Sequence, residues 1–183
     1  MNLSKRREIL NKIILVFILV FIALCFIFTI IGNSFPSITS KVLIAAEEGF
    51  SGFVGLDPVQ LAIAIFQKNL ISSLVVAFIS CYLFGIPIFV FMLVNTALIG
   101  ALLAEHPNFI VGLLPHGIIE IPAVCIALAL GWHIWRRKEK TWLKIKRRDV
   151  IFFMKTVVPL LIIAAVVEVY VTPHIISRYI ILP

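Results

Sequence analysis

Two ionisable residues in a strongly apolar stretch are the first candidates for chemistry in this sequence. His116 and Glu120 lie four positions apart in the segment LPHGIIEIPA, residues 114–123, so on a helix they share one face. Pro115 and Gly117 beside them favour the start of a helix at this point. An ionisable pair at the mouth of a membrane helix is costly, so it indicates a functional site or a polar contact that binds helices together.

The composition predicts a membrane protein. Of the 183 residues, 62% are hydrophobic and 14% are charged, and the mean hydropathy is +1.14. A soluble domain of this size could not bury so much apolar surface, so we expect an all-α bundle in a single membrane domain, residues 1–183. The net charge of +7 comes mainly from two short basic segments beside apolar runs. These segments indicate topology signals and contacts with the lipid bilayer, and not a nucleic-acid-binding surface.

Five apolar runs predict five membrane spans, at about 1.5 Å of rise per residue. They cover residues 9–31, 70–84, 87–104, 117–135 and 150–171. The basic tail, residues 1–8, and the basic loop, residues 136–149, then lie on the same side of the membrane. The excess of lysine and arginine predicts that this side is cytoplasmic, which puts the C-terminus of this multi-pass cell-membrane protein outside.

The connections between the spans carry two further predictions. Residues 32–68 are predicted to form an outer segment on the membrane surface, with a short amphipathic helix that is capped by Asp57, continues with Pro58 and ends near residues 67–69. Residues 108–114 are too few to cross the membrane and are predicted to re-enter it beside the other helices.

Small residues recur every four positions in the fourth span, at Ala123, Ala127 and Gly131. This stripe predicts a close contact with another helix, either within the chain or in a homo-oligomer. Asn95, in the third span, is expected to hydrogen-bond to a partner helix, as buried asparagines in membranes do.

Glu168, in the fifth span, is predicted to approach His116 and Glu120. The fourth and fifth spans run in opposite directions from the same basic loop, so Glu120 and Glu168 come within about one helical turn of the same depth. Asn69, near the outer end of the second span, reaches a similar level. A group formed by these four side chains could relay protons, bind a cation or hold the helices together.

Two motifs in the sequence resemble those of the stage II sporulation protein M family. The first, PHGIIEIPA, includes Pro115, Gly117 and Pro122, and the second, AAVVEVYVTP, ends with Thr172 and Pro173. The family carries PHG-x-x-E-x-P-A-like and A-A-x-x-E-x-x-x-T-P-like motifs in a membrane domain of about five spans. The resemblance extends from about residue 58 onward.

The resemblance implies a membrane scaffold. The namesake of the family looks like a scaffold that holds peptidoglycan-degrading partners during engulfment of the forespore. Members also occur in organisms that do not form spores, and some are suspected of accompanying transport systems. The resemblance is therefore no evidence of sporulation in the organism that makes this protein.

The expected function is that of a non-enzymatic scaffold or assembly factor that contacts other membrane or envelope proteins. The alternative is a transport or permease-type component whose buried carboxylates bind a proton or a cation. An enzyme is disfavoured and no catalytic residue is predicted, because the sequence carries none of the common catalytic motifs. No cofactor or metal is predicted, since His116 and Glu120 alone are too few for a zinc site and His106 or His174 could add ligands only through an unpredicted fold.

Overall fold

The computed structural model of the chain describes residues 3–137 and 145–179, and every regular element in these two ranges is helical. The α-helices are α1 (Leu3–Ser34), α2 (Pro36–Phe50), α3 (Pro58–Leu74), α4 (Ile86–Glu105), α5 (Ile110–Trp135), α6 (Arg147–Tyr170) and α7 (Thr172–Tyr179). Short 3₁₀ turns cover Ser51–Phe53 and Pro107–Phe109, and a π-helical turn, η2, covers Val75–Ile79.

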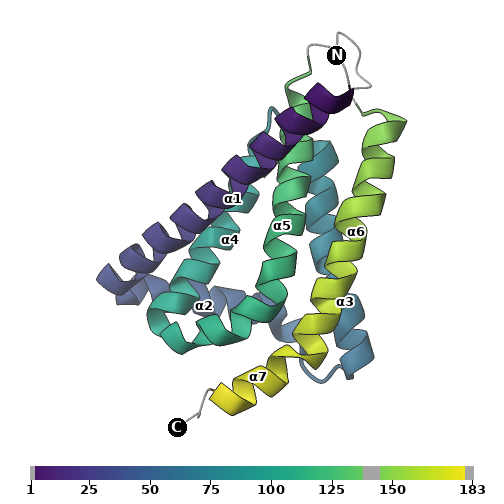
Figure 1. Cartoon of the computed structure of the whole chain (residues 1–183). Coiled ribbons are helices and arrows are strands. Elements are labelled where there is room, and N and C mark those ends of the chain that lie inside the picture. The colour runs from purple at the N-terminus through teal and green to yellow at the C-terminus, as the bar shows by residue number, and fades with distance from the viewer. Residues whose placement is uncertain (1–2, 138–144, 180–183) are drawn as a thin grey trace.

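Five helical stretches are long and apolar enough to cross a membrane, which confirms the predicted all-α bundle of about five spans. They are Glu8–Ser34, Pro58–Ile79, Ile86–Glu105, Pro107–Trp135 and Arg147–Ile175. In Figure 1 the start of α1 lies at the same end of the bundle as the end of α5 and the start of α6, whereas α2 and α7 lie at the other end. The two basic segments of the sequence therefore adjoin helix ends on one side of the bundle.

The second span begins earlier than the sequence predicts. Asp57 caps α3 as predicted, because its Oδ1 accepts the backbone N–H groups of Val59 and Gln60 at 2.9 and 3.0 Å. The predicted end near residues 67–69 is wrong, since α3 continues to Leu74 and then through η2 as one span. A lysine followed by an asparagine is a helix-stop signal, but Leu70 packs against the buried cluster and α3 continues through it.

The segment between the first and second spans does contain a separate short helix, but it is α2. This helix begins at Pro36. Proline suits the first helical position, because the N–H group that it lacks would have no hydrogen-bond partner within the helix there. The predicted outer segment of residues 32–68 is therefore divided, because its last eleven residues, 58–68, belong to the second span.

The prediction of a re-entrant segment before the fourth span is also wrong. Residues 110–114 form the first turns of α5, which continues unbroken through Pro115 and Pro122. A proline within a helix removes one backbone hydrogen bond and bends the helix, and neighbouring helices can hold it together across the bend. In Figure 1 the first turns of α5 run across the end of the bundle before the helix turns along it.

α5 lies at the centre of the bundle and packs on two sides. One buried cluster joins it to α6 and to the segment around η2, through Ala77, Cys81, Ala123, Ala127, Leu130, Ile134, Phe153, Val157 and Leu161. The other joins it to α1 and α4, through Phe21, Val76, Ile88, Met92, Val124, Cys125 and Leu128.

The small-residue stripe of α5 lies inside the chain. Ala123 and Ala127 are fully buried, in the cluster shared with α6. Gly131 lies directly against η2, so closely that a Cβ atom added to it would collide with the carbonyl oxygen of Val76. The sequence did not indicate a second close approach, in which Gly100 of α4 contacts the backbone of α1 at Phe28.

Candidate functional site

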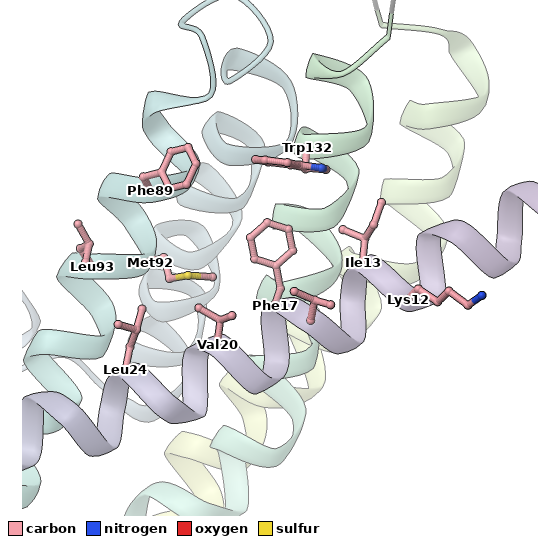
Figure 2. A pocket seen from close by; sticks show the side chains of 10 residues that line it. Lys12, Ile13, Phe17, Val20, Leu24, Phe89, Met92, Leu93 and Trp132 are labelled. Atoms are coloured by element: carbon pink, nitrogen blue, oxygen red, sulfur yellow. The ribbon is translucent and has the colours of Figure 1, made fainter.

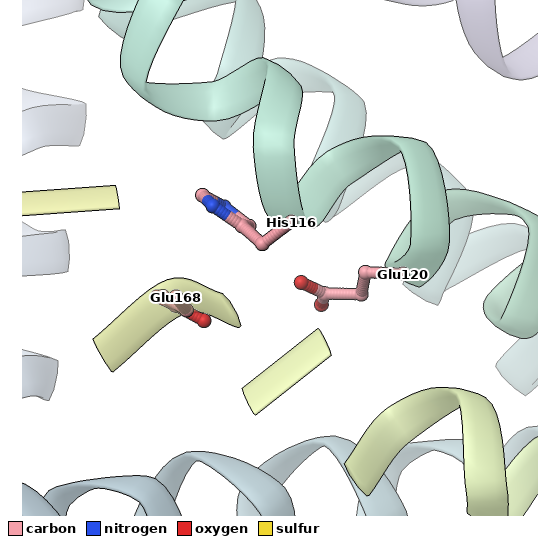
Figure 3. A group of neighbouring side chains, drawn as sticks. All are labelled: His116, Glu120 and Glu168. Carbon is pink, nitrogen blue, oxygen red and sulfur yellow. The ribbon is translucent and has the colours of Figure 1, made fainter. Parts of the chain in front are cut away.

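α5 and α6 bring three of the predicted polar residues together. His116, Glu120 and Glu168 each offer a nitrogen or oxygen atom, and these atoms all lie within 4.8 Å of one another. All three side chains are partly buried, and Figure 3 shows them converging on the space between the two helices. We call these three residues the polar cluster.

The two sequence motifs meet at the polar cluster. His116 and Glu120 lie one turn apart on α5, and Glu168 lies near the end of α6, which runs in the opposite direction. Thr172, the first residue of α7, places its Oγ1 3.3 Å from Nδ1 of His116. The same hydroxyl donates to the carbonyl of Val167 at 3.3 Å and is almost fully buried. The second motif thus supplies both a carboxylate and a hydroxyl that orients the imidazole of the first.

The structure places Asn95, which was not predicted to join the polar cluster, beside two of its residues. Asn95 of α4 shares a cavity of about 60 Å³ with His116 and Glu120. Its Nδ2 donates to the carbonyl of Phe91 at 2.8 Å, within its own helix, so the predicted bond to a partner helix is not the one it makes.

Asn69 lies on α3 and has no hydrogen bond to the polar cluster among the residues that the structure describes. Its neighbour Lys68 is exposed, and its Nζ lies 5.8 Å from the centroid of the Phe53 ring. The ammonium group of Lys68 is near enough to Glu120 and Glu168 for its positive charge to stabilise the negative charge of both.

The polar cluster can bind a positively charged species. It offers an imidazole nitrogen and the oxygens of two carboxylates. Two carboxylates at this distance repel each other strongly in an apolar medium, and the repulsion is relieved by a shared proton or by a cation between them.

A second polar contact joins α5 and α6 at the other end of the bundle. Arg137 donates two hydrogen bonds to Asp149, at 2.6 Å from Nη1 to Oδ2 and at 2.7 Å from Nη2 to Oδ1. Asp149 also accepts the backbone N–H of Lys146 at 2.9 Å, which caps the start of α6. The side chains of Arg137 and Asp149 are only 9% and 5% exposed. The sequence did not indicate this pair, because basic residues dominate the segment 136–149.

A bundle of apolar helices with ionisable groups between two of them defines a polytopic helical membrane protein with an intramembrane polar site. Within this class, the sequence matches the model of the family described as stage II sporulation protein M over residues 13–173, so the chain belongs to that family. This confirms the resemblance seen in the two motifs and extends it into the first span. A comparison with curated proteins and with solved structures found no match.

Proposed function

We propose that this protein is a non-enzymatic scaffold or assembly factor of the cell envelope, which binds a membrane-spanning helix of another membrane protein. Membership of the stage II sporulation protein M family supports this proposal, because the family resemblance implies a scaffold. The structural observation that carries it is an apolar groove beside α1, open to the side of the bundle.

The groove lies where α1 crosses α4 and α5, and it has a volume of about 490 Å³. Figure 2 shows Phe17 and Val20 of α1 on one side of it, Leu93 of α4 on another and Trp132 of α5 above. In the most apolar window of α1, only 6% of the residues are buried. Grooves between helices accept the side-chain ridges of a further helix, so an apolar helix with bulky side chains suits this surface.

Photo-crosslinking in native membranes tests the groove as a binding surface. A photoreactive residue in place of Leu93 is expected to form a crosslink with one particular membrane protein. The control position is Ile163, because Leu93 and Ile163 are both 49% exposed but Ile163 lies on α6, away from the groove. Crosslinks to lipid only, or the same products from both positions, would contradict the proposal.

The identity of the crosslinked protein separates the scaffold from a second candidate function, a transport component. The polar cluster favours this second candidate, because intramembrane carboxylates and histidines often carry protons or cations along a transport path. A wall hydrolase or another envelope protein at Leu93 supports the scaffold, and a transport ATPase supports the transport component.

We also propose that the N-terminus is cytoplasmic and the C-terminus external. The arrangement of helix ends supports this orientation, since both basic segments adjoin the same end of the bundle. A cysteine placed at Ser177, in a chain whose native cysteines are replaced, is expected to react with a membrane-impermeant reagent added to intact cells. Labelling that requires permeabilised cells would show the opposite orientation.

A further inference from the structure

We propose that the polar cluster is a binding site for one divalent transition-metal cation of the zinc type, which joins α5 to α6 within the membrane. The inference is independent of the scaffold function, because a metal at this position acts on the helix bundle whichever partner the protein has. It rests on the mixture of ligand types, on the contact that orients the histidine and on the charge of the site.

Ligand atoms of two chemical types converge at the polar cluster. His116, Glu120 and Glu168 come from two helices, and their nitrogen and oxygen atoms gather within 4.8 Å of one another. A histidine with two carboxylates is a ligand set that zinc and related first-row cations accept. Magnesium and calcium prefer oxygen ligands alone, so the imidazole argues against them. His116 and Glu120 alone are too few for such a site, and Glu168 of α6 supplies the third ligand.

A contact with the start of α7 orients the histidine. A metal-binding histidine almost always has its other ring nitrogen held by a hydrogen-bonding group, which fixes the ring. Thr172 is such a group, since its Oγ1 lies 3.3 Å from Nδ1 of His116 and is itself held by the carbonyl of Val167.

The charge of the two carboxylates also favours a bound cation. At the other end of the same two helices, the buried carboxylate of Asp149 has a bidentate arginine and a backbone N–H as partners. Neither Glu120 nor Glu168 has a hydrogen bond to another described side chain, although Lys68 stabilises both through its charge. A divalent cation neutralises the two carboxylates together, which removes the repulsion between them in an apolar medium.

A metal titration of the purified full-length protein tests the site. After treatment with a chelator, the protein is titrated with Zn²⁺ in detergent, and both the bound metal and the Tm are measured. We expect one Zn²⁺ per chain and a Tm that rises with Zn²⁺ concentration, because a ligand that binds only the folded state stabilises it. Mg²⁺ and Ca²⁺ are expected to leave the Tm unchanged. No saturable binding of Zn²⁺, or a larger effect of Mg²⁺ or Ca²⁺, would overturn the proposal.

Substitutions in the polar cluster test whether its residues bind the Zn²⁺. Glu120→Gln and Glu168→Gln are each expected to weaken Zn²⁺ binding by more than about 100-fold, since loss of an outer partner alone costs about 10–100-fold. Thr172→Val removes only the hydrogen-bonding partner of His116, so we expect it to weaken Zn²⁺ binding by about 10–100-fold. His106→Ala is the control, because His106 is exposed and lies outside the cluster. Equal affinity in His106→Ala and the two glutamine variants would overturn the assignment.

Co²⁺ bound to the wild-type protein gives a readout that does not depend on the folding of any variant. A site of one imidazole and two carboxylates is expected to give visible absorption bands without a thiolate-to-metal charge-transfer band. A strong thiolate band would place the metal at Cys25, Cys81 or Cys125 instead, and would overturn the proposal. A failure of metal binding leaves the crosslinking result at Leu93 unaffected, so the two proposals fail separately.

Discussion

Replacing Arg137 with alanine is expected to lower the free energy of unfolding by about 3–5 kcal/mol, because the substitution leaves the buried carboxylate of Asp149 without its charged partner. Both side chains of the pair are almost fully buried, and the two hydrogen bonds between them are short. The pair also ties the end of α5 to the start of α6. The measurement is thermal or denaturant unfolding of the purified protein in detergent, and Asp149→Ala is expected to show a loss of similar size.

An exposed ion pair in the same chain provides the control. Lys12 and Glu8 are four residues apart on α1 and 2.7 Å from each other, and their side chains are 73% and 63% exposed. Exposed pairs at this spacing contribute about 0.3–0.5 kcal/mol, so Glu8→Gln is expected to have a small effect. Equal losses from Arg137→Ala and Glu8→Gln would show that the Arg137–Asp149 pair is not buried in the folded protein.

The second large effect is expected at Gly131. Helix propensity alone predicts that Gly131→Ala stabilises the helix by about 1 kcal/mol. The structure predicts the opposite sign, because the new methyl group would collide with the carbonyl oxygen of Val76 and lie 3.2 Å from its carbonyl carbon. Backbone atoms cannot turn aside as a side chain can, so we expect a loss of about 3 kcal/mol, the upper end of the overpacking range.

Gly117→Ala is the matched control for Gly131→Ala. Both glycines lie within α5, but a Cβ atom at Gly117 has Ile121 Cδ1 as its nearest neighbour, at an ordinary 3.8 Å. We therefore expect Gly117→Ala to be neutral or slightly stabilising in the same unfolding measurement. A stabilising Gly131→Ala would contradict the close approach of α5 to η2.

Hydropathy and helix-start signals predict the outline of this fold well, because both depend on local sequence. The five apolar stretches and the cap at Asp57 are examples. Helix ends inside apolar stretches were harder to predict. Pro115 and Gly117 predict a helix start, yet packing on both sides of α5 holds the helix together through Pro115 and Pro122.

The sequence predicts how deep the site residues lie in the membrane, but not which way each side chain points around its helix. Counting residues from the basic loop puts Glu120 and Glu168 at similar depths, and the structure has them together. Which face of a helix points inward depends on tertiary packing, so the sequence did not indicate that the charge of Lys68 acts on Glu120 and Glu168. The pair of Arg137 and Asp149 joins residues twelve apart across a connection, and no local pattern marks such a contact.

The most direct test of the central claim, that His116, Glu120 and Glu168 form one site between α5 and α6, is an experimental structure of the protein prepared with Zn²⁺. Anomalous diffraction at the zinc absorption edge would locate the metal. We expect one peak between the three side chains, at about 2.0–2.2 Å from its nitrogen and oxygen ligands. Either carboxylate pointing into the lipid with no polar neighbour would contradict the account.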